Sequence, residues 1–189
     1  MRIGLLLFFT LLLCGCVTSQ PQDNRPSAWL VPGVKVKLPP PGIEPAFQQQ
    51  QLLTGVVNGK QQSLVVLLNA NADRITLAGL SSVGIRLFRV IYDAQGIHTQ
   101  QMLVLPQMPP ASQVLADIML SHWPLASWSK QLPAGWTLRD EGESRYLRDP
   151  GGKVVTEIHY LQRGNQREPI SIQQHVFGYQ ILIQHLDAS

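Results

Sequence analysis

Few residues in this sequence have the types and spacing that could do chemistry, and they match no reactive pattern closely. Ser81 and Ser82 lie between Gly79 and Gly84, in a stretch similar to the Gly-x-Ser-x-Gly turn that exposes a nucleophilic serine. The stretch is one residue too long, because Val83 stands where that turn needs a glycine. An esterase or acyltransferase using one of these serines is therefore the least favoured of three function classes.

The histidines and carboxylates also lack the spacing of a metal site or of an acid/base pair. No two of the five histidines are four residues apart, and none has a cysteine or aspartate at ligand spacing. Three carboxylates interleave with three arginines around one turn, a pattern typical of a solvated charge cluster. They are Asp140, Glu141, Glu143, Arg139, Arg145 and Arg148. We expect no enzyme activity, no metal and no cofactor.

The first residues of the chain have the layout of a secretory signal. The cation Arg2 is followed by the apolar run 3–13, which is too short to cross a bilayer as a helix, because a span takes about 20 apolar residues. The stretch Leu13-Cys14-Gly15-Cys16 ends this run and resembles the Leu-x-Gly-Cys motif of bacterial lipoproteins. We therefore predict a signal peptide over residues 1–15, and the alternative is an uncleaved apolar helix.

In lipoproteins of this kind the cysteine of the motif becomes the acylated N-terminus, so Cys16 is the predicted site for palmitate and other acyl chains. Each buried CH₂ contributes about 0.8 kcal/mol, so several chains would hold the protein on the membrane. Val17 follows where an aspartate would resemble an inner-membrane retention signal. We therefore expect a lipid-anchored protein of the outer membrane that faces the periplasm. The mature chain keeps no free thiol.

The number and distribution of charged residues argue against binding to nucleic acid. The formal net charge is +3, and charged residues make up 14% of the chain, where about a quarter is usual. Lysine and arginine are scattered rather than clustered, so the basic patch that phosphate binding needs is missing. We expect no nucleic-acid partner.

The chain after the signal divides into a proline-rich part and a strand-rich part. Residues 16–46 contain Pro39-Pro40-Pro41 and are predicted to form a lipidated tether, in which residues 34–38 could still pair as an edge strand. Apolar runs separated by turn residues then predict antiparallel strands. The dipeptide Asn58-Gly59 predicts a type I′ hairpin turn. The predicted strands are 52–57, 63–68, 74–80, 84–92, 97–105, 136–139, 144–148, 153–161, 170–177 and 179–186.

Between the two groups of strands the pattern becomes helical. Ser112 is the predicted N-cap of a helix over 113–122, whose apolar residues form one stripe. Pro124 ends this helix, and a second short helical segment over 125–132 ends at Pro133. Such a stripe is usually plain core, so core packing remains open beside any binding role.

Residues 74–80 with 84–87, and residues 120–136, resemble the corresponding stretches of LolB, the outer-membrane lipoprotein receptor. The pattern over 47–186 resembles still more an uncharacterised lipoprotein family often encoded with aryl-polyene lipid biosynthesis, itself thought to be LolB-like. The resemblance implies an α+β domain over 47–189. Its fold would be a curved antiparallel half-barrel of LolA/LolB type, in which inserted helices cover the concave face and leave an apolar cavity for acyl chains.

Within that architecture, apolar residues of the strands and helices become candidates for the cavity lining. They are Leu77, Phe88, Leu115, Ile118, Met119, Trp123, Trp128 and Leu132. Leu80 is a leucine in a predicted turn, so it either folds back onto the core or projects as a tip that touches the membrane. LolB carries a protruding leucine in the loop that Leu80 resembles, and this resemblance favours projection.

The favoured hypothesis is a non-enzymatic outer-membrane lipoprotein that binds acyl chains of a lipid or lipoprotein and helps place them in the membrane. Its partners would be membrane lipid, through the N-terminal acyl chains, an acyl-chain or lipoprotein cargo, and a LolA-like periplasmic carrier. The alternative is a scaffold or accessory lipoprotein of an envelope or aryl-polyene lipid pathway that acts through protein contacts alone.

Overall fold

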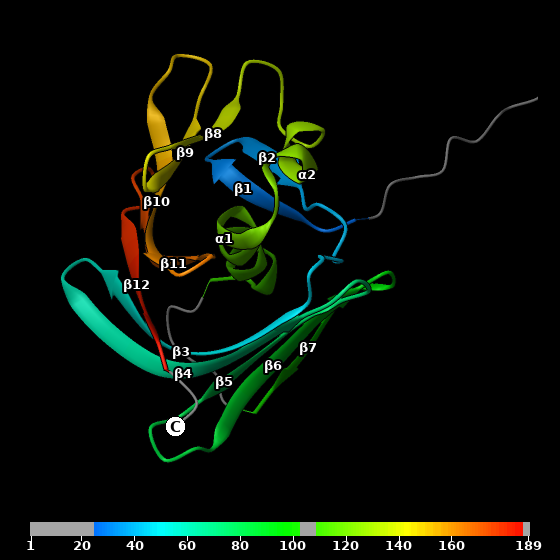
Figure 1. The fold of residues 1–189 in the computed structure, drawn as a ribbon, viewed down its shortest axis with the longest axis vertical. Coiled ribbons are helices and arrows are strands. Elements are labelled where there is room, and N and C mark those ends of the chain that lie inside the picture. Colours follow the sequence, from blue (N-terminus) through cyan, green and yellow to red (C-terminus); the bar gives the residue numbers. More distant parts are fainter. Residues whose placement is uncertain (1–24, 103–108, 187–189) are drawn as a thin grey trace, which may run out of the picture.

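The computed structural model describes residues 25–102 and 109–186, which form a ten-stranded antiparallel sheet, a separate two-stranded hairpin and two helices (Figure 1). The hairpin consists of β1 (Ser27–Val31) and β2 (Val34–Lys37), and the helices are α1 (Ala111–His122) and α2 (Leu125–Ser129). The large sheet contains β3 (Phe47–Val57), β4 (Lys60–Ala70), β5 (Ile75–Leu80), β6 (Arg86–Asp93), β7 (Gly96–Gln101), β8 (Thr137–Glu141), β9 (Ser144–Arg148), β10 (Val154–Arg163), β11 (Gln166–Gln174) and β12 (Tyr179–His185).

The order of the strands is β7-β6-β5-β4-β3-β12-β11-β10-β9-β8, so two meanders meet where the last strand pairs with β3. In that pairing Leu53 lies opposite Ile183, and Gly55 lies opposite Ile181. The sheet is open, because β7 and β8 do not pair with each other. The predicted α+β class with an antiparallel sheet is confirmed. The strands do not follow one another as one continuous meander, because β12, the last strand, returns to pair with β3.

The sheet curves around α1 and the β1–β2 hairpin, which lie on its concave side (Figure 1). Alternation along the strands sends every second side chain to this side. Leu68, Leu77 and Val90 form one row across β4, β5 and β6, and each is 1% exposed. The hydrophobic core therefore occupies the space between the concave face, the hairpin and α1.

The turn between β3 and β4 has the predicted geometry. Asn58 and Gly59 have φ angles of 50° and 75°, as both central residues of a type I′ turn require. This turn fixes the register of the hairpin, in which Val57 lies opposite Lys60.

The predicted tether over 16–46 is wrong for its C-terminal part, because β1 and β2 belong to the folded domain. Ala28, Leu30, Val36 and Leu38 are at most 2% exposed and are part of the core. The proline-rich segment that follows is also fixed, since Tyr92 donates its hydroxyl hydrogen to the Pro39 carbonyl at 3.0 Å. Residues 16–24 lie outside the described residues.

Two details of the helices differ from the prediction. The first helix begins at Ala111, after Pro110 and without a side-chain cap, so Ser112 is inside its first turn and is not the N-cap. The second helix is shorter than the predicted segment 125–132, since it ends at Ser129. Pro110 and Pro124 precede the two helices, as expected of a residue that cannot donate a backbone hydrogen bond.

Candidate functional site

The eight residues proposed to line a cavity inside the half-barrel belong to the core or pack against it. Six of them are at most 3% exposed, and Ile118 and Leu132 are partly buried against the same cluster. The packing leaves little space, because a Cβ atom added to Gly79 would overlap the Phe88 ring. The fully packed residues are Leu77, Phe88, Leu115, Met119, Trp123 and Trp128. At these six positions the structure supports the core alternative.

Hydrogen bonds as well as apolar contacts hold α1 in this position. The Trp128 indole N–H donates to the Met119 carbonyl at 3.1 Å, and the Tyr160 hydroxyl donates to the Ser121 carbonyl at 2.8 Å. Trp123 reaches the Pro40 carbonyl at 3.2 Å. Each indole thus satisfies its only donor while its ring fills the core. These bonds tie the helix to β10, to α2 and to the segment after β2.

The predicted solvated charge cluster is only partly solvated, because Arg145 is buried and caps the C-terminal end of α1. Its Nη1 donates to the carbonyls of Leu120 at 2.7 Å and Trp123 at 2.9 Å. Its Nε and Nη2 donate to Asp140 at 2.8 Å and 3.1 Å. A cation at this end of a helix satisfies carbonyls that have no partner within the helix and is favoured by the helix dipole.

The two arginines beside Asp140 change the pKa of its carboxyl group. Burial acts to raise the pKa of Asp140, but hydrogen bonds from Arg145 and Arg167 outweigh burial and hold that pKa below its ordinary value. The exposed pair Arg148 and Glu141, at 3.2 Å, matches the predicted solvated cluster.

A second acid, Asp117 of α1, is buried and has no ion-pair partner among residues 25–102 and 109–186. Its Oδ2 accepts a hydrogen bond from the Tyr179 hydroxyl at 2.7 Å, while its Oδ1 has no partner among the described residues. Burial raises the pKa of Asp117 to about 7, against the opposing effect of hydrogen bonds from Tyr179 and Gln113. A carboxyl group in this setting titrates near neutral pH.

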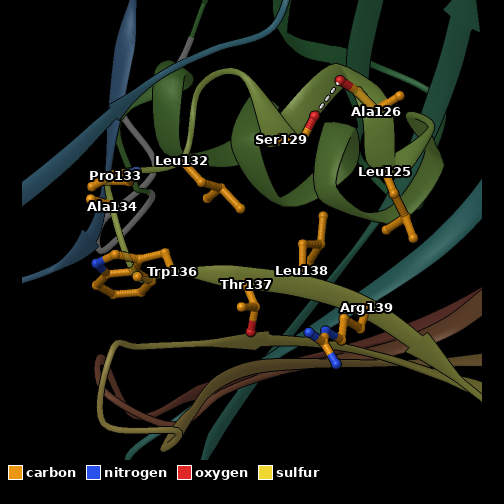
Figure 2. Close-up of a pocket in the computed structure, with 11 residues that line it drawn as sticks. Leu125, Ala126, Ser129, Leu132, Pro133, Ala134, Trp136, Thr137, Leu138 and Arg139 are labelled. Atoms are coloured by element: carbon orange, nitrogen blue, oxygen red, sulfur yellow. Dashed lines mark hydrogen bonds between the residues drawn. The ribbon is translucent and has the colours of Figure 1, made fainter.

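A pocket lined by both apolar and polar side chains lies beside the core, between α2 and the edge strand β8 (Figure 2). Its volume is about 480 Å³, within the range of roughly 300 to 1,000 Å³ that is typical of ligand pockets. In Figure 2, Leu125 of α2, Leu132 of the following loop and Leu138 of β8 point toward the same space. The Ser129 hydroxyl donates to the Ala126 carbonyl at 3.0 Å, so it offers its hydrogen to the helix and not to the pocket. Leu132 is the one predicted cavity residue among its lining.

The turn between β5 and β6 presents apolar side chains to solvent, but Leu80 is not the foremost of them. Leu80 is the last residue of β5, as in the predicted strand 74–80, and it is half-buried, so it lies at the base of the turn and not within it. Val83 and Ile85 are 77% and 58% exposed. Ser81 Oγ accepts the Ile85 N–H at 3.1 Å and so serves the turn itself.

The predicted lipid attachment site, Cys16, lies outside the described residues. Within residues 25–102 and 109–186, no helix is long and apolar enough to cross a membrane. The same residues contain no group of three or more histidine, cysteine or acidic side chains placed to hold a metal ion.

Residues 48–187 match a family described as "Protein of unknown function (DUF3261)", and this range covers most of the chain. The chain belongs to the DUF3261 family. A comparison with curated proteins finds no match. The DUF3261 description assigns no activity, so the function must be argued from the residues of the fold.

Several residues of these sites were absent from the predicted set. Leu125 and Leu138 line the pocket. The sequence indicated them only indirectly, because the short predicted helix between Pro124 and Pro133 is followed within a few residues by the predicted strand 136–139. Val83 and Ile85 could have been found as apolar residues on either side of Gly84, since glycine is common in turns. Asp117 gave a clear signal, since it is the only acidic residue of a helix that carries a broad apolar stripe.

Proposed function

We propose that this DUF3261 protein is a lipoprotein of the outer membrane, anchored through acylated Cys16 and facing the periplasm, that binds acyl chains of a lipid or lipoprotein and helps place them in the membrane. The observation that carries this proposal is the pocket between α2 and β8. Its three converging leucines offer apolar surface to a chain, and its volume of about 480 Å³ suits a lipid-sized ligand.

The architecture supports a LolB-like relationship at the level of the fold. An open, curved antiparallel sheet surrounds α1 on its concave side (Figure 1). In this reading a LolA-like periplasmic carrier delivers the cargo. The acyl chain rests in the pocket between α2 and β8, because side chains fill the interior of the half-barrel.

The β5–β6 turn is the part of the domain best suited to touch a bilayer. Val83 and Ile85 can enter the acyl boundary, while the exposed Arg86 beside them is attracted to anionic head groups. Leu80 supports the base of this turn from β5. Figure 1 places the turn at the bottom of the sheet and α2 at the top, so cargo holding and membrane contact occupy separate ends.

Binding at the pocket is tested with a fluorescent fatty acid and the variant Leu125→Gln. Leu125 is half-buried in α2 and lines the pocket, so a polar side chain there should weaken probe binding at least tenfold. The matched control is Leu67→Gln, at a 40% exposed leucine of β4 outside the pocket, which should leave the affinity unchanged. Equal affinity in both variants would remove the pocket from the proposal.

Membrane contact is tested by transfer of the bound probe to anionic liposomes. Val83→Glu should slow transfer without changing probe affinity, because insertion of a carboxylate into the acyl boundary is unfavourable. The control is Val57→Glu, which adds the same charge at the end of another hairpin, where the valine is 37% exposed. Transfer that slows equally in both variants would point to general charge repulsion.

The scaffold alternative also has an observation in its favour. The proposed interior cavity residues are packed core, and among the described strands the outer edges of β7 and β8 have no strand partner. Such edges can pair with a strand of another protein. This alternative predicts no co-purifying lipid and no effect of Leu125→Gln on any lipid probe.

A further inference from the structure

A row of hydroxyl, imidazole and carboxylate groups crosses the convex face of the sheet where β9 pairs with β10. Ser144 lies directly opposite His159, and its Oγ is 2.8 Å from Nδ1 of that ring. The other ring nitrogen, Nε2, is 3.2 Å from Oε1 of Glu157. Glu157 and His159 are two residues apart on one strand, so alternation places them on the same face.

This order of groups is the arrangement that activates a serine. A nucleophile and a base must be within about 2.6 to 3.2 Å, and a third group must orient the base. When the Glu157 carboxylate accepts the Nε2 hydrogen, the ring keeps the tautomer whose Nδ1 lone pair faces Ser144. The serine hydroxyl then donates to Nδ1, which can take its proton.

Exposed apolar side chains border the row. Leu161 follows His159 by two residues on β10 and is 43% exposed. Leu182 lies opposite Ser171, which itself lies opposite His159, and this leucine is 41% exposed. Large apolar groups that gather on an exposed face commonly mark a binding surface.

Ile170, 38% exposed, extends the same border. It precedes Ser171, at the point where the pairing of β10 with β11 shifts register. The convex face thus joins a serine, a base and an acid to a short apolar platform.

We propose that Ser144, His159 and Glu157 form an esterase site for acyl esters, whose acyl chain rests on Leu161, Ile170 and Leu182. The site goes beyond the proposed binding function and does not depend on it, because it lies on another face of the sheet. Ser144 is 8% exposed and sits beside the imidazole, whose side chain is 46% exposed. His175 approaches the other oxygen of Glu157 at 3.5 Å and helps to fix the carboxylate.

The reaction uses only an ester and water. Ser144 Oγ bonds to the acyl carbon while its proton passes to His159 Nδ1, and the bond from that carbon to the alcohol oxygen breaks. The alcohol leaves with the proton from His159. Water then attacks the acyl-serine and gives one proton to the same nitrogen, and Ser144 regains a proton as the carboxylic acid departs.

The test uses the purified mature chain and diisopropyl fluorophosphate, followed by peptide mapping of the adduct, with hydrolysis of p-nitrophenyl butyrate as a second readout. We expect one adduct, on Ser144, and turnover that Ser144→Ala abolishes. His159→Gln should slow both reactions at least about a hundredfold, which is the usual contribution of a general base. The matched control is Ser63→Ala, because Ser63 pairs with the Thr54 hydroxyl at 2.7 Å on the same face and has no imidazole.

Glu157 is tested as a positioning residue through the pH profile of labelling. Glu157→Gln should slow labelling of Ser144 and move the midpoint of its pH dependence, while Ser63→Ala leaves both unchanged. A wild-type chain without an adduct on Ser144 would overturn the proposal whether or not any variant folds. Labelling that His159→Gln leaves at the wild-type rate would also overturn it. The two proposals can fail separately. If Leu125→Gln loses fatty-acid binding while Ser144 of the wild-type chain stays unlabelled, the pocket proposal stands and the esterase proposal fails.

Discussion

The buried carboxyl group of Asp117 makes stability depend on pH in a direction that can be calculated. Its pKa is about 7 in the folded chain, against the ordinary aspartate value of 3.8 that applies to the unfolded chain. A raised folded pKa means that the native state holds the proton more tightly. The stabilisation is therefore complete below the unfolded pKa and is lost as the pH rises through the folded pKa.

The magnitude follows from the same two values. Between pH 5 and about pH 7 the Asp117 carboxyl stays protonated in the folded chain but is ionised in the unfolded chain. Each of these two pH units lowers the free energy of unfolding by 1.36 kcal/mol, so the total loss between pH 5 and pH 8 is about 3 kcal/mol. Asp117→Asn removes this titration and keeps an acceptor for the Tyr179 hydroxyl. The variant should therefore gain about 3 kcal/mol relative to wild type between pH 5 and pH 8.

The assay is urea denaturation of both proteins at several pH values between 5 and 8. Comparison at each pH is essential because His122 acts in the opposite direction. Burial, together with the charges of His185 and Arg145, lowers the pKa of His122 to about 3, so its contribution is complete above pH 6.5 and is lost as the pH falls. This contribution cancels in the difference between the two proteins. A difference that stays constant from pH 5 to pH 8 would refute the reasoning.

Three further predictions concern the core, the helix cap and the anchor. Trp128→Ala should cost about 3 to 5 kcal/mol in chemical denaturation, since the ring is 0% exposed, and a much smaller loss would show that the site is not tightly packed. Arg145→Ala should destabilise the fold by about 2 to 3 kcal/mol, because it removes charged hydrogen bonds to the end of α1 while Arg167 still pairs with Asp140. Arg148→Ala, at an exposed pair, should cost at most about 1 kcal/mol by the same assay. Cys16→Ala should abolish palmitate labelling, and label that persists would contradict the assigned anchor.

Short sequence patterns correctly predicted the turns and helices that depend on neighbouring residues in the chain. Asn58-Gly59 allowed the turn that joins β3 to β4, because both residues tolerate positive φ angles. The helix over 113–122 followed from its apolar spacing and from Pro124. Residues 34–38 were predicted to pair as an edge strand and form β2, but β1 was missed, because the high density of proline around it is typical of a linker.

Features that depend on pairing between distant segments could not be predicted in the same way. The contact of β12 with β3 joins residues more than a hundred positions apart, and nothing in either strand names its partner. The same limit applies to the core, because an apolar stripe is usually packed core but does not by itself exclude a cavity. Glu157 and His159 could be placed on one face from the sequence, but Ser144 joins them only through the register of β9 and β10.

Native mass spectrometry of the mature, acylated protein tests acyl-chain binding most directly. The proposed function predicts a bound acyl lipid in addition to the covalent anchor, retained in Leu67→Gln and lost in Leu125→Gln. A protein that carries only its covalent lipid, or that retains the extra lipid equally in both variants, would contradict binding in the pocket between α2 and β8.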